Sequence, residues 1–197
     1  MAQVSKPQLS FSTGMYILGA ILVLAVPIRW LLAWTIAAVL HECFHCLAVI
    51  LTGKRIRSIR IGAFGAEIYT DPLQPIQTVV CALSGPLAGF LLLPFAKFLP
   101  RIALCATAQS VCNLLPVQPL DGSVAMRGFL QMLFSEKTTV RICDILQKTM
   151  VALLIFLGGY AACRWKLVNL PLVFAAVLLL RGWKRKIPCK YGLYRVQ

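Results

Sequence analysis

The 197-residue sequence has few acidic residues and few charged residues of any kind. It contains six Asp and Glu against twenty Lys and Arg, so its formal net charge is +14, yet only 13% of the residues are charged. Soluble domains are about 25% charged and about 45–50% apolar, whereas this chain is 59% hydrophobic with a mean hydropathy of +0.81. These values exclude a soluble enzyme, a disordered basic tail and a nucleic-acid-binding module. A 21.7 kDa interior cannot hide so much apolar surface, so the surplus must face lipid.

The chain also lacks the features of a secreted, disulfide-stabilised protein. Only Lys6 precedes the first apolar stretch and no small-residue cleavage site follows it, so we expect no signal peptide. The eight cysteines lie inside apolar runs or near their edges, where a free thiol behaves as a small hydrophobic side chain. We therefore expect no disulfide framework.

Six apolar runs predict an all-α polytopic membrane protein with about six transmembrane helices, since a hydrocarbon core needs about 20 apolar residues per crossing. Alternating basic and apolar residues over 54–61, followed by a glycine turn at 62–65, predict a small interfacial β-hairpin over 56–69 after the second span. Residues 122–148 predict a helix near the interface. We expect one domain over 1–197, with a core at 15–135 and the last two spans and a basic tail at 138–197. The six runs are residues 9–28, 30–51, 76–96, 99–120, 149–163 and 167–180, of which the last two are short for a full crossing.

The basic residues predict the orientation of these spans. With six crossings, fifteen Lys and Arg fall on one side of the membrane and five on the other. Because Lys and Arg are enriched in cytoplasmic loops, both termini are predicted to be cytoplasmic. The basic tail is interpreted as a flank that faces solvent or lipid headgroups of the bilayer, and no nucleic acid is expected as a partner.

The second span contains the segment His41-Glu42-Cys43-Phe44-His45, which holds both histidines of the protein. On a helix, residues four apart lie on one face about 6 Å from each other, so both imidazoles can bind one zinc ion. Glu42 borders the same face and can reach a metal-bound water. The motif lies near the bilayer midplane, where an ionisable group costs several kcal/mol unless it is paired or functional. Cys43 and Cys46 lie on the opposite face and are rejected as ligands.

A catalytic zinc site needs a third protein ligand and one open position. The residues alone leave five acids as candidates for that ligand. Two prolines at positions 116 and 119 should break the helix before Asp121, and irregular backbone at membrane depth is tolerated only around a protein-lined cavity. The five candidates are Glu67, Asp71, Asp121, Glu136 and Asp144.

These motifs resemble the site-2 protease family of intramembrane zinc metalloproteases. HECFH matches the family's HExxH, and residues 113–122 (NLLPVQPLDG) match its Asn/Pro…Leu-Asp-Gly signature about 75 residues further on. Ser84-Gly85-Pro86 is similar to the family's Gly-Pro element. The chain is most like the short bacterial branch of stage IV sporulation protein FB. The resemblance covers residues 15–135, and the tail after Trp183 is too short for the nucleotide-binding module usual in that branch.

The resemblance implies one Zn²⁺ per chain, ligated by His41, His45 and Asp121. It implies that Glu42 acts as general base and then proton shuttle, and that Asn113 helps to polarise or hold the substrate carbonyl. It further implies a multi-pass protein of a bacterial cell membrane that cuts membrane-associated protein substrates, such as a sigma-factor or other transcription-factor precursor, under the control of regulatory membrane proteins. Gly85 and Gly89 form a GxxxG pattern, which we interpret as a helix-packing face.

Other classes fit the sequence less well. A rhomboid-type serine protease needs a free His beside Ser84, and both histidines already lie in HExxH. An aspartyl protease needs two Asp in facing spans, and only Asp121 qualifies. A zinc-binding membrane transporter and a non-catalytic membrane scaffold stay open as alternatives, and replacement of Glu42 separates them from an enzyme.

Overall fold

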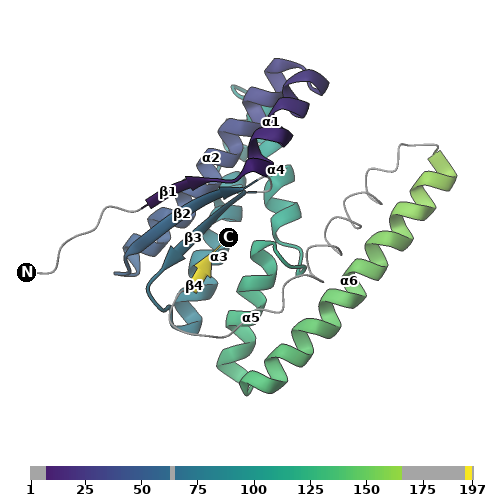
Figure 1. Ribbon diagram of the computed structural model, residues 1–197. Coiled ribbons are helices and arrows are strands. Elements are labelled where there is room, and N and C mark those ends of the chain that lie inside the picture. The colour runs from purple at the N-terminus through teal and green to yellow at the C-terminus, as the bar shows by residue number, and fades with distance from the viewer. Residues whose placement is uncertain (1–7, 63–64, 166–193, 197) are drawn as a thin grey trace, which may run out of the picture.

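The computed structural model describes residues 8–62, 65–165 and 194–196, and these form a mostly helical protein with one small sheet. The sheet lies on one side of the helices and the long helix α6 on the other (Figure 1). The helices are α1 Thr13–Ala25, α2 Ile28–Leu51, α3 Pro75–Leu91, α4 Pro100–Asn113, α5 Asp121–Leu133 and α6 Glu136–Trp165, with a short 3₁₀ turn at Leu93–Phe95.

Proline sets the start of three helices. Pro27 caps α2, while Pro75 and Pro100 are the first residues of α3 and α4, a position where the missing N–H costs no helical hydrogen bond. The start of α3 is also closed by reciprocal hydrogen bonds between Gln74 and Gln77. The local sequence therefore defines the N-terminal boundaries of the helices that build the core.

Among the described residues, two of the predicted crossings coincide with helices that could span a membrane. α2 and the segment Pro75–Phe95 are long and apolar enough to cross a bilayer. α1 has 13 residues and is apolar but short. The other predicted crossings stay predictions, and the sixth run, 167–180, lies outside the described residues.

Three predicted segments differ from the structure. The first run begins as a strand and becomes helical only at Thr13. The fourth run is helical only to Asn113, because Pro116 and Pro119 interrupt it, so Asp121 does not close a span but begins α5. The predicted interfacial helix over 122–148 is two helices, the second of which continues without a break through the fifth run.

The predicted hairpin is confirmed, but it belongs to a larger sheet than the sequence indicated. The strands are β1 Gln8–Phe11, β2 Ile56–Gly62, β3 Gly65–Thr70 and β4 Tyr194–Val196, in the order β1-β2-β3-β4. β1 runs parallel to β2, and the other neighbours are antiparallel. Strands of three or four residues show no usable hydropathy period, so β1 and β4 form through pairing with the hairpin and could not be predicted locally.

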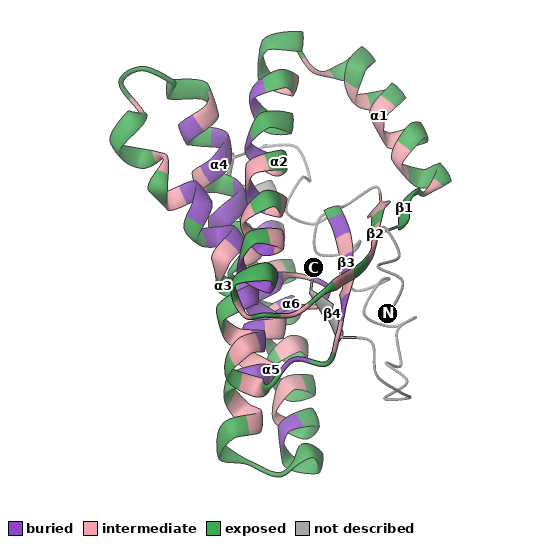
Figure 2. Ribbon diagram, turned by 90° about the vertical axis from the view of Figure 1, so that its left-hand side faces the viewer, coloured by how far each residue is buried: buried purple, intermediate pink, exposed green. Residues whose placement is uncertain are grey.

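Small residues allow the central helices to pack closely. Buried residues gather where α2, α3 and α4 meet, whereas α1 stands apart with none (Figure 2). A cluster of Ala33, Ala37, Cys105 and Ala106 joins α2 to α4. A Cβ on Gly89 would collide with Ser110 Oγ and the carbonyl of Ala106, so the predicted packing role of Gly89 is confirmed.

Candidate metal centre

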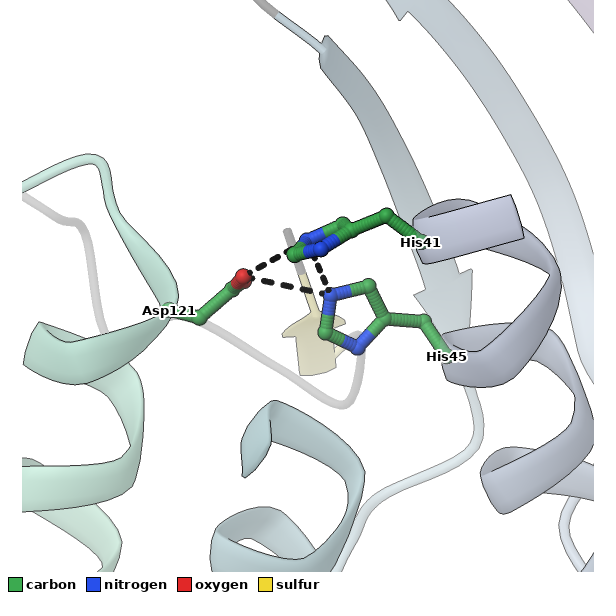
Figure 3. A group of neighbouring side chains, drawn as sticks. All are labelled: His41, His45 and Asp121. Atoms are coloured by element: carbon green, nitrogen blue, oxygen red, sulfur yellow. Dashed lines mark hydrogen bonds and ion pairs between the residues drawn. The ribbon is translucent and has the colours of Figure 1, made fainter. Parts of the chain in front are cut away.

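Two helices bring three ligand atoms to one buried point. His41 and His45 project from successive turns of α2 toward Asp121, the first residue of α5 (Figure 3). Their exposed fractions are 6%, 0% and 2%. His41 Nε2 lies 2.9 Å from Asp121 Oδ2, His45 Nε2 lies 3.3 Å from the same oxygen, and the two Nε2 atoms are 3.1 Å apart. Residues 76 positions apart in sequence therefore share one site.

The triangle of donor atoms matches the dimensions of a zinc site. Ligand atoms placed tetrahedrally at 2.0–2.1 Å from an ion lie about 3.3 Å from one another. The three separations observed here are 2.9, 3.1 and 3.3 Å. Two imidazoles and one carboxylate are also the donor set of many catalytic zinc sites, which leave the fourth position open. The residues present therefore fit a zinc ion, and they form the one group of this kind among the described residues.

A backbone carbonyl fixes the tautomer of the neutral His45 ring. Its Nδ1 lies 2.7 Å from the carbonyl oxygen of Cys81 in α3. Because a carbonyl only accepts hydrogen bonds, Nδ1 must carry the proton, and the lone pair of a neutral ring is then on Nε2, which faces the site. Ser84 Oγ donates to the same carbonyl. α3 therefore orients one ligand, as outer-sphere groups do in metal sites.

Gly85 gives both imidazoles the space that they occupy. A Cβ at this position would collide with His45 Nε2, and it would lie 2.6 Å from His45 Cε1 and 2.7 Å from His41 Nε2. The interpretation of Gly85 as part of a helix-packing face is therefore incomplete, since this glycine contacts the ligands themselves. The Ser-Gly-Pro similarity was the signal that pointed to this position.

The irregular segment 114–120 delivers Asp121 to the site. Val117 is fully buried in a cluster with Val151 of α6, which anchors the segment. A Cβ on Gly122 would collide with the carbonyl of Leu114, so glycine is needed for the chain to turn back into α5. Asp121 is the first residue of α5, so its carboxylate also lies at the positive end of that helix's dipole.

One carboxylate oxygen of Glu42 accepts a hydrogen bond, and the other has no partner in the structure. The backbone N–H of Ala66 in β3 donates to Glu42 Oε1 at 3.1 Å. Glu42 Oε2 is buried and has no hydrogen-bond partner in the structure. Buried polar atoms are normally paired, so an unpaired carboxylate oxygen beside the three ligands is suited to a water or substrate hydrogen. The sheet thus reaches the site through a backbone group, which the sequence could not indicate.

Asn113 completes the group of polar side chains. It is the last residue of α4, and its Nδ2 lies 3.2 Å from His41 Nε2. The structure therefore brings together all five residues that the sequence analysis named as functional.

The other candidate ligands lie elsewhere. Asp71 pairs with Arg57 at 2.6 Å, and this guanidinium lowers the pKa of the Asp71 carboxyl. Hydrogen bonds from Gln131 and Arg127 likewise lower the pKa of Glu136. Asp144 forms an ion pair with Lys148 in the same way. Each of these three carboxylates is therefore paired with a basic side chain and not with the histidines. The remaining candidate, Glu67, accepts a hydrogen bond from Tyr69. Of the two cysteines rejected as ligands, Cys43 is exposed and Cys46 is half-buried.

The fold is shared with a solved structure. It resembles the site-2 protease from Methanocaldococcus jannaschii with a TM-score of 0.66, over 97% of this chain and 98% of that chain, at 16% sequence identity. No protein-family model matches the sequence, and no curated protein matches it. At this identity the likeness concerns the fold, and it agrees with the resemblance to site-2 proteases that the motifs indicate, while the six spans stay a prediction. The assignment to the sporulation branch stays a prediction.

Proposed function

We propose that this chain is an intramembrane zinc metalloprotease that hydrolyses peptide bonds of membrane-associated protein substrates. The observation that carries the proposal is the convergence of His41, His45 and Asp121 within 3.3 Å, beside a glutamate with an unpaired oxygen. Both histidines and this glutamate belong to a helix that is apolar enough to cross a membrane. The fold shared with a site-2 protease supports the same activity. One group of three ligands among the described residues is less suited to a transporter, which passes ions between several sites.

Each residue of the site has a role in this proposal. His41, His45 and Asp121 would hold Zn²⁺, which acts as a Lewis acid and lowers the pKa of its water to about 7. Glu42 Oε2 takes the proton from the attacking water and returns it to the leaving amine, while the Ala66 N–H holds Oε1 in place. The amide of Asn113 donates to the substrate carbonyl oxygen as negative charge develops there.

The location of the site favours access from the cytoplasmic side. Under the predicted orientation, α2 runs from the outer face to the cytoplasm, and the break at 114–120 and the hairpin both lie toward its cytoplasmic end. We propose a multi-pass bacterial membrane protein with six crossings and both termini in the cytoplasm. The cut then falls within the cytoplasmic half of the substrate's span. The resemblance to the sporulation branch makes membrane-tethered transcription-factor precursors the first substrates to test, with regulatory membrane proteins as partners.

Replacement of Glu42 tests the proposed activity. Purified native protein and Glu42→Gln are reconstituted in liposomes with a tethered substrate, and both zinc content and cleavage are measured, with Glu136→Gln as the matched control. An enzyme keeps its zinc and loses cleavage by at least about 10²-fold in Glu42→Gln, since general base catalysis contributes that much. Equal cleavage by native protein and Glu42→Gln would contradict the proposal. Zinc transport that persists in Glu42→Gln would favour the transporter.

A further inference from the structure

One edge of β3 leads to the candidate site. Ile61 accepts a hydrogen bond from Ser12 with its carbonyl, so its backbone groups face away from β3 in the pair Ile61–Ala66. The N–H of Ala66 therefore points to the opposite edge, where Glu42 accepts it. Backbone groups alternate along a strand, so Ile68 and Thr70 present their N–H and C=O to this same edge.

The C-terminal strand occupies that edge. β4 pairs antiparallel with β3, with Val196 opposite Ile68 and Tyr194 opposite Thr70 (Figure 1). β4 therefore runs along β3 in the direction of Ala66. A strand that paired with β3 in the same register and continued for two further residues, about 7 Å of extended chain, would reach a position opposite Ala66 and beside Glu42.

We propose that β4 is an internal competitor of the substrate, because it pairs in cis with the β3 edge on which an extended substrate segment binds. The inference rests on the proposed function, since a protease must bind its substrate in an extended form. An edge strand recognises any extended peptide through main-chain hydrogen bonds. A substrate segment that pairs with β3 where β4 now lies would extend to Glu42. β4 and an unwound substrate therefore compete for the same backbone groups of Ile68 and Thr70.

Two proline variants test the pairing at matched positions. Val196 is opposite Ile68 in a hydrogen-bonded pair, so Val196→Pro removes a donor to β3. The N–H of Arg195 faces away from β3, so Arg195→Pro is the control. If β4 is paired in about nine of ten molecules, Val196→Pro and a variant ending at Leu193 should lower KM about tenfold with kcat unchanged, and Arg195→Pro should not. An unchanged KM in both the truncated variant and Val196→Pro would overturn the inference.

A reversible disulfide that holds β4 on β3 tests the inference in the opposite direction, because it prevents β4 from leaving the edge. Tyr69 and Arg195 are Cα partners in a pair without mutual hydrogen bonds, which suits a disulfide. Oxidised Tyr69→Cys/Arg195→Cys should lose cleavage and regain it on reduction, whereas each single variant should respond to neither treatment. Full cleavage with the cross-link confirmed by mass spectrometry would also overturn the inference.

A readout without proteolysis separates the two proposals. Truncation after Leu193 should speed hydrogen exchange at the amides of Ile68 and Thr70 but not at Tyr69, whose N–H faces β2. Unchanged exchange at Ile68 and Thr70 would refute the pairing itself. Cleavage that depends on Glu42 but responds to neither the truncation nor the disulfide would refute this inference and leave the proposed function intact. Absence of cleavage from native and truncated protein alike would refute the proposed function.

Discussion

A single methyl group at Gly85 should weaken metal binding. In Gly85→Ala the new Cβ would lie 2.6 Å from His45 Cε1, whereas ordinary contacts begin at 3.4 Å. The imidazole must therefore retreat by about 0.8 Å, and zinc–ligand distances tolerate only about 0.2 Å. His41 Nε2 is displaced by the same methyl group. Loss of a group that merely orients a ligand costs 10–100-fold in affinity. We expect a weakening of about 100-fold, because two ligands are moved at once.

The assay is zinc affinity measured by chelator competition on purified protein in detergent, with the thermal midpoint of the metal-free protein recorded alongside. Gly89→Ala is the matched control in the same helix, since its Cβ would meet Ser110 and Ala106 rather than a ligand. That variant should lower the thermal midpoint more than it changes zinc affinity. Gly159→Ala, with nothing within 4 Å of the added atom, should change neither. Zinc affinity of Gly85→Ala within about threefold of native protein would refute the arrangement of ligands described above.

Three further predictions concern the third ligand, the sheet and the topology. Asp121→Ala should bind zinc at least about 100-fold more weakly, because a direct ligand is lost; native affinity by the same chelator assay would contradict the assignment. Arg57 holds the pKa of Asp71 below its ordinary 3.8, so the ion pair stabilises the fold fully above that pH and the benefit is lost as pH falls through the lower folded-state pKa. Asp71→Asn should thus unfold at a lower temperature than native protein at pH 6, and a gap that does not narrow below pH 3.8 would refute this pairing. Reporter fusions after Lys6 and after Gln197 should both be cytoplasmic, and an outer location of either would contradict the six-span topology.

The local part of the site could be predicted from the sequence. The helix period alone places His41 and His45 on one face, so their convergence follows from the spacing HExxH. Asp121 was one of five candidates by composition, and only the resemblance to a family selected it. The structure adds why it reaches the site: Pro116 and Pro119 end α4 early, and the released segment turns directly into α5.

The parts that could not be predicted depend on backbone groups and on tertiary contacts. The Cys81 carbonyl that orients His45 and the Ala66 N–H that holds Glu42 belong to residues whose side chains play no part in these bonds. The role of Gly85 depends on which neighbour its missing side chain would strike, and the GxxxG pattern indicated only close packing. β4 is three residues long and pairs with a strand more than 120 residues earlier, so no local pattern marks it.

The zinc centre of His41, His45 and Asp121 is tested most directly by the X-ray absorption spectrum of zinc in the purified native protein. We expect one zinc per chain surrounded by nitrogen and oxygen ligands at 2.0–2.2 Å, with an imidazole signal that is lost when His41 and His45 are both replaced by Ala. A sulfur shell at about 2.3 Å would instead assign the metal to the cysteines of the same helix, Cys43 and Cys46. That spectrum, or unchanged zinc content in the double variant, would contradict the account.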